Sequence, residues 1–184
     1  VRLCHWAIAL SGLLLCFSGI GFMPLYGRFF VNEIPGLHWA SDFAVQMQLH
    51  YLSAMVFMAA CAFHLLYHWR RGESAAWPKR GDLNESWLIV RAMLSGGKEP
   101  ENGKFLAEQR IAYAVIGAAS LLLIITGMFL AWKSSVQVIL DPTLIQVVTL
   151  THQVTTFAFM ALIALHLAAF VLKANRLLLP SMFT

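Results

Sequence analysis

Four long stretches of the sequence contain no Asp, Glu, Lys or Arg, and this feature limits the folds that the chain can adopt. The stretches cover residues 3–27, 43–69, 111–132 and 142–172. Each is longer than the roughly 20 residues that a helix needs to cross the hydrocarbon core of a bilayer. Only 12% of the 184 residues are charged, against about 25% in an ordinary soluble domain. We therefore predict an all-α fold, a bundle of four transmembrane helices.

The predicted spans belong to one membrane domain, residues 1–184, and cover about residues 4–25, 44–68, 110–132 and 144–172. A large loop of about residues 70–109 joins the second span to the third, and its segment 86–94, SWLIVRAML, is expected to form a short amphipathic helix. Of the 13 Lys and Arg residues, all but Arg28 and Lys133 lie in this loop or near the chain ends. The positive-inside rule then places the loop and both termini in the cytoplasm. The basic residues face membrane lipid in this arrangement, so we expect no nucleic-acid partner.

The predicted spans carry histidines but no carboxylate. His50 and His64 lie 14 residues apart in the second span, and His152 and His166 have the same spacing in the fourth. Fourteen helical residues rise about 21 Å. Since the second and fourth spans run in the same direction, these histidines form an outer and an inner level, and His5 of the first span arrives at the inner one.

Several kinds of site could use such histidines. A single buried histidine is most simply hydrogen-bonded to a neighbouring group. A proton relay would alternate histidine with Asp or Glu, and a zinc site needs three or four clustered ligands. Five histidines at matched depths favour two haems b, each with its iron between imidazoles from two helices. A histidine-lined transporter and a structural anchor, both without haem, stay open as alternatives.

Several short motifs resemble one known family when they are taken together. They are R-L-C-H-W at 2–6, S-G-I-G-F at 18–22, Q-L-H at 48–50, G-K-F-L-A-E-Q-R at 103–110, T-G-M-F-L-A-W at 126–132 and T-H at 151–152. In this order the chain resembles, over nearly its whole length, the cytochrome b (gamma) subunit of membrane-bound formate dehydrogenases. Related b-type subunits serve nickel–iron hydrogenases and thiosulfate reductases.

The resemblance implies an electron-transfer subunit with two haems b. Electrons would pass from a catalytic subunit through an iron–sulfur subunit to a quinone, menaquinone or ubiquinone, and the complex could form a higher oligomer. The resemblance implies His50 and His152 as ligands of the outer haem, and His5 and His166 as ligands of the inner one. Spacing alone keeps His64 as an alternative inner ligand. The chain itself has no site for the primary substrate of such a complex.

The resemblance also implies a quinone site near Gln109, His166 and Lys104. Where the family typically reads G-K-Y-N-A-G-Q-K, this chain reads G-K-F-L-A-E-Q-R. Leu106 and Glu108 thus replace the asparagine and glycine proposed to line the quinone pocket. The departure predicts an altered or lost pocket, whereas the haem prediction does not depend on these two positions.

Overall fold

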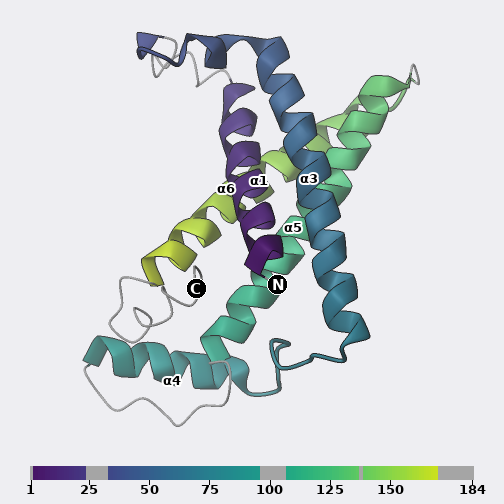
Figure 1. Ribbon diagram of the computed structural model, residues 1–184. Helices are drawn as coiled ribbons and strands as arrows, with labels where there is room; N and C mark the ends of the chain where they lie inside the picture. The colour runs from purple at the N-terminus through teal and green to yellow at the C-terminus, as the bar shows by residue number, and fades with distance from the viewer. Residues whose placement is uncertain (1, 24–32, 96–106, 137–138, 170–184) are drawn as a thin grey trace. The chain divides into compact units, whose positions relative to one another are not determined.

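The computed structural model describes residues 2–23, 33–95, 107–136 and 139–169, and all regular elements of these segments are helices (Figure 1). The elements are α1 (Arg2–Gly21), the 3-10 helix η2 (His38–Ser41), α3 (Phe43–Arg70), α4 (Asp82–Ser95), α5 (Ala107–Ser135) and α6 (Pro142–Ala169). By length and composition, α1, α3, α5 and α6 can each cross a membrane. The predicted all-α class with four membrane helices is confirmed.

Aspartates begin two of the membrane helices. The Oδ1 atom of Asp42 accepts hydrogen bonds from the backbone N–H groups of Ala44 and Val45, at 2.8 and 3.1 Å. Asp141 accepts from the N–H of Thr143 at 2.9 Å, and Pro142 is the first residue of α6. A side-chain acceptor satisfies N–H groups that have no partner inside the helix, and proline fits the first helical position. These caps explain why α3 and α6 begin where the long apolar runs begin.

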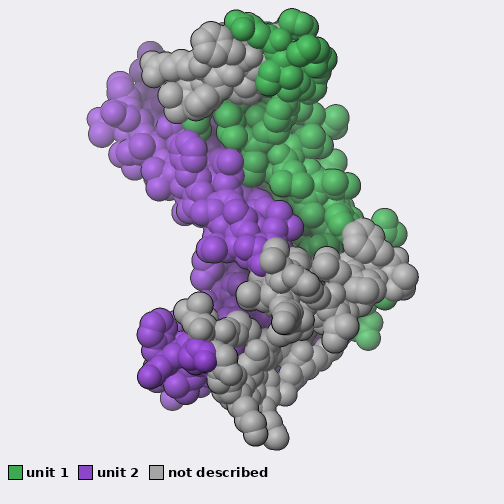
Figure 2. Space-filling view, turned by 90° about the vertical axis from the view of Figure 1, so that its left-hand side faces the viewer, with its two compact units in different colours: residues 1–71 green, residues 72–184 purple. Residues whose placement is uncertain are grey.

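The chain divides into two compact units, residues 1–71 and residues 72–184, which Figure 2 colours separately. Unit 1 holds α1, η2 and α3, and unit 2 holds α4, α5 and α6. We describe each unit by itself. That the whole chain forms one membrane domain remains a prediction.

In unit 1, α1 and α3 form an antiparallel hairpin (Figure 1). Cys4, Ser11 and Ser18 are buried and lie seven residues apart on α1. Positions seven residues apart share one face of a helix, and small side chains there let two helices approach closely. The Cys4 thiol donates to the carbonyl of Ala60 at 3.3 Å, which ties the start of α1 to the second half of α3. Small residues therefore set the contact between these helices.

In unit 2, α5 and α6 form a second helical pair, and α4 lies across the start of α5 (Figure 1). The interfacial helix that we predicted over residues 86–94 is confirmed as a helix, and it extends over Asp82–Ser95. Its Leu83 and Trp87 side chains are largely exposed, as are Leu121 and Ile125 on α5. Apolar side chains that face outward in this way are expected where a helix contacts lipid.

Candidate functional site

His50 lies on α3 and is held by the neighbouring helix α1. Its Nδ1 atom lies 2.9 Å from the hydroxyl oxygen of Ser18. The next residue is Gly19, and a Cβ atom added there would lie 3.7 Å from His50 Cε1, so the ring passes over the glycine backbone. The ring of Phe22 packs edge-on against the imidazole, with the centroids 5.2 Å apart. The imidazole is thus fixed by a hydroxyl, a glycine surface and an aromatic ring.

His152 lies on α6 and is held in the same way by α5. Its Nδ1 atom lies 2.8 Å from Thr126 Oγ1. Gly127 follows Thr126, and a Cβ atom there would lie 3.2 Å from His152 Cε1. Because this distance is shorter than an ordinary contact between carbon atoms of about 3.5–4.0 Å, the ring position depends on the missing side chain.

The two units therefore repeat one arrangement. Ser18-Gly19 on α1 corresponds to Thr126-Gly127 on α5, and His50 on α3 corresponds to His152 on α6. Buried residues also agree in type after each histidine: Ser53 and Thr155 lie three residues on, and Phe57 and Phe159 lie seven residues on. The sequence analysis missed this repeat. Ser-Gly and Thr-Gly, each followed on the next apolar run by a histidine, would have been the signal.

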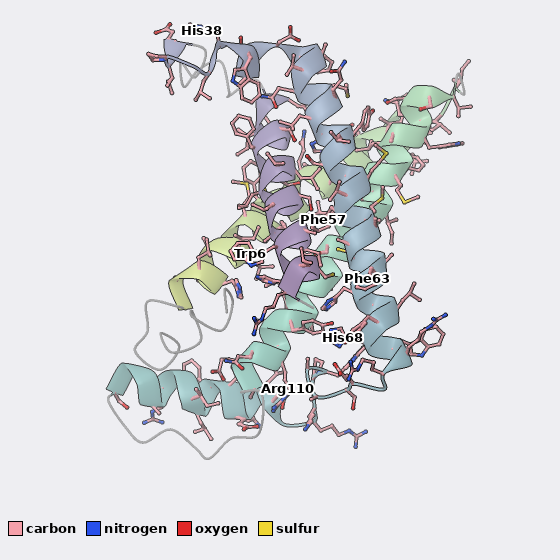
Figure 3. All side chains as sticks on the ribbon, viewed as in Figure 1. Trp6, His38, Phe57, Phe63, His68 and Arg110 are labelled. Atoms are coloured by element: carbon pink, nitrogen blue, oxygen red, sulfur yellow. The ribbon has the colours of Figure 1, made fainter. Side chains whose placement is uncertain are left out.

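Four further histidines lie in unit 1. The rings of His64 and His68, one turn apart on α3, meet edge-on with centroids 4.5 Å apart. His5 lies in the first turn of α1, and its ring packs edge-on against Trp6 with the centroids 5.9 Å apart. His38 lies in η2 at the other end of unit 1 from His68 (Figure 3). The structure thus brings His5 and His64, the two alternative inner ligands, to the same end of one hairpin.

The other predicted site residues lie in unit 2 or outside the described segments. His166 is exposed near the end of α6, and Gln109 is partly buried in the first turn of α5. Lys104 lies outside the described residues. His50 and His152 belong to different units, as do His5 and His166, so the sharing of one haem by each pair stays a prediction.

Within the described segments, no three His, Cys, Asp or Glu side chains gather closely enough to hold a metal ion by themselves. The imidazoles in the spans are instead offered by separate helices. A haem iron needs only two axial ligands, one on each face of the porphyrin. The ring edge over glycine and the Nδ1 atom held by a hydroxyl leave Nε2 as the atom that could bind iron. The residues at His50 and His152 therefore fit haem b.

An ion pair connects α4 to α5. Arg110 donates from Nε to one carboxylate oxygen of Asp82 at 2.9 Å and from one terminal nitrogen to the other at 2.6 Å, and Glu85 lies 3.5 Å away. The Lys79 backbone N–H also donates to Asp82, at 2.7 Å. The Arg110 guanidinium, helped by this N–H group, holds the pKa of Asp82 at about 2. Arg110 therefore lies where α4 meets the first turn of α5 (Figure 3).

The structure has four membrane helices, and each of its two helical pairs presents an imidazole that is hydrogen-bonded to a hydroxyl. These features are typical of a membrane-embedded cytochrome of the b type. A comparison with curated proteins gives no match. Residues 1–184 match the family described as prokaryotic cytochrome b561, and the chain belongs to that family. It is a multi-pass membrane subunit that carries two haems b and transfers electrons, and members of the family anchor respiratory complexes.

Proposed function

We propose that the chain is the cytochrome b subunit of a respiratory oxidoreductase of the formate dehydrogenase type. It receives electrons from an iron–sulfur subunit that is served by a catalytic subunit, and delivers them to a quinone. The haem irons, when bound, supply the one-electron carriers. The observation that carries this proposal is the repeated contact of an imidazole with a hydroxyl on the neighbouring helix, at His50 and at His152.

The outer haem is held by His50 and His152. Both rings keep Nδ1 engaged with a hydroxyl, at 2.9 and 2.8 Å, and both pass over a glycine. Metal-ligating histidines usually direct the nitrogen that does not bind the metal to such a hydrogen-bond partner. The two rings are therefore suited to the same task, as two ligands of one iron require.

The inner haem is held by His5 and His166. His64 already has its ring against His68 on the same helix, at 4.5 Å. A contact between two residues of one helix orients the His64 ring without a cofactor. The resemblance of R-L-C-H-W at 2–6 to the formate dehydrogenase subunits supports His5 as the ligand and His64 as its neighbour.

The quinone binds near Gln109, His166 and Lys104. Gln109 lies in the first turn of α5, beside the buried Arg110 that pairs with Asp82. An amide and a cationic side chain at the membrane boundary could hydrogen-bond to the carbonyl oxygens of menaquinone or ubiquinone. Glu108 occupies the position of a smaller residue in formate dehydrogenase subunits, so the pocket differs in shape from theirs.

The resemblance supports a location in the bacterial inner membrane, and the positive-inside pattern supports both termini in the cytoplasm. With both termini in the cytoplasm, the outer haem lies near the membrane face opposite to the cytoplasm. An iron–sulfur subunit that delivers electrons to this haem must dock on that face. A cytochrome b subunit of a nickel–iron hydrogenase would use the same ligands. Reduction of the haems by formate or by hydrogen, measured in the complex purified with its partner subunits, separates these donors.

Absorption spectra of the purified full chain test the proposal. We expect two haems b per chain by pyridine haemochrome quantitation after dithionite reduction. His50→Ala and His152→Ala should each remove the same haem, and His5→Ala should remove the other. His64→Ala should keep both haems, as should the control His38→Ala in η2. A chain without haem, or a chain that loses a haem with His64→Ala but not with His5→Ala, contradicts the proposed ligands.

A further inference from the structure

The hydroxyl groups of Ser18 and Thr126 each have one proton to donate, and the distances show where it points. Ser18 Oγ lies 2.7 Å from the carbonyl oxygen of Leu14 and 2.9 Å from His50 Nδ1. Thr126 Oγ1 lies 2.7 Å from the carbonyl oxygen of Leu122 and 2.8 Å from His152 Nδ1. Two oxygens this close are held together by a proton between them.

That proton can only be the hydroxyl proton, because a carbonyl oxygen has none to give. If the hydroxyl donated to the imidazole instead, two oxygen lone pairs would face each other at 2.7 Å in an apolar span. The hydroxyl therefore donates to the carbonyl and accepts from the imidazole. A neutral imidazole that donates from Nδ1 carries its lone pair on Nε2.

We propose that Ser18 and Thr126 are positioning residues that hold His50 and His152 in the Nδ1–H tautomer, so that Nε2 is the nitrogen presented to iron. This inference rests on the proposed haem ligands. The tautomer of a ligating histidine is set by the hydrogen bond of its other nitrogen. The same bond makes Nε2 a stronger electron donor and so favours ferric iron over ferrous iron.

The repeat supports this inference, since the device occurs once in each unit. In both units the residue with the accepting hydroxyl precedes a glycine, and the imidazole edge passes over that glycine. A Cβ atom added at Gly19 would lie 3.7 Å from Cε1 of His50, and one added at Gly127 would lie 3.2 Å from Cε1 of His152. The hydroxyl fixes the hydrogen-bond direction and the glycine fixes how closely the ring can approach. Together they determine the orientation of each ring within its own hairpin.

Redox titration of the full chain tests the role of the hydroxyl groups. Ser18→Ala and Thr126→Val remove the acceptor with little change in volume. We expect each variant to shift the midpoint potential of one haem to a more positive value and to leave the other haem unchanged. The controls are Ser11→Ala and Ser120→Ala, because both serines are buried and donate to a carbonyl four residues back, as Ser18 and Thr126 do. Unchanged potentials in both test variants, or equal shifts in the controls, would overturn the inference.

The tautomer can be measured directly by nitrogen-15 NMR of the histidine-labelled chain, reduced so that low-spin ferrous haem is diamagnetic. We expect a proton on Nδ1 of both His50 and His152. In the Thr126→Val variant, the Nδ1 proton of His152 should exchange faster with water than in the unchanged chain. A proton on Nε2 of either ring would refute the tautomer assignment. A chain that binds no haem would refute the proposed function instead, and the same spectrum would still report the tautomer.

Discussion

Replacing Gly127 with alanine tests how closely the α5 backbone fits the ring of His152. The new Cβ would lie 3.2 Å from His152 Cε1, and carbon atoms in contact are about 3.5–4.0 Å apart, so the ring must move by at least about 0.3 Å. Overpacking of a well-packed site costs about 1–3 kcal/mol. If the whole cost is borne by the bond between His152 and the iron, haem retention weakens about 5- to 160-fold. Transfer of haem from the purified chain to excess apomyoglobin, followed by absorbance, measures the loss.

Gly19→Ala is the matched control, because its Cβ would lie 3.7 Å from His50 Cε1, an ordinary contact. Both variants gain the same intrinsic helix propensity, about 1 kcal/mol over glycine. The difference between them therefore reports the ring contact and not the helix. Equal haem retention in the two variants, or a greater loss with Gly19→Ala, would refute the reasoning from these distances.

Three further predictions concern contacts outside the ligand pair. The pKa of Asp82 is lowered to about 2. Its ion pair with Arg110 therefore contributes fully to stability above about pH 4, and this contribution is lost as the pH falls through 2. Trp87 fluorescence should report the separation of α4 from α5 over that pH range. Arg110→Lys keeps the charge, but lysine has no planar group that can bind both carboxylate oxygens of Asp82. Amide hydrogen exchange in α4 should therefore become several-fold faster, while exchange in α6 stays unchanged. Gly21→Ala would place a Cβ 2.8 Å from Gln46 Cδ. The Gln46 side-chain amide would then be displaced from its 2.7 Å hydrogen bond to the carbonyl of Ala40. We expect faster hydrogen exchange of the backbone amides in η2 with an intact haem spectrum, and unchanged exchange would contradict this prediction.

The sequence predicted the fold class because bilayer thickness and the absence of charge determine it together. It also predicted the start of α3 and α6 within two residues, because the charge-free runs begin there. The capping aspartates that the structure shows at both starts were not part of that prediction. The helix over 86–94 was expected as a short amphipathic helix, but its first turn was not. That turn begins at Asp82, whose carboxylate accepts hydrogen bonds from the Lys79 backbone N–H and from Arg110, far along the chain.

The candidate site was predicted only in part. His50 and His152 stand out as polar residues in apolar spans, but the groups that hold them do not. Ser18 and Thr126 look like the other small and hydroxylated residues of their helices, and whether one of them meets a histidine depends on the rotation of two helices about their axes. Hydrophobic periodicity is weak in helices that are apolar on every face, so the sequence does not define that rotation.

The position of the hydroxyl partner has a consequence for how the subunit assembles its ligands. Ser18 reaches His50 within unit 1, and Thr126 reaches His152 within unit 2. Each imidazole is therefore oriented by the hairpin that carries it, before any group from the other unit is needed. On the proposed pairing, a haem that binds between two such rings meets ligands whose conformational entropy has already been lost on folding, which lowers the entropic cost of binding. The small residues of α1 and the Ser-Gly and Thr-Gly pairs thus serve haem binding through the packing of their own hairpin, although none of them needs to touch the iron.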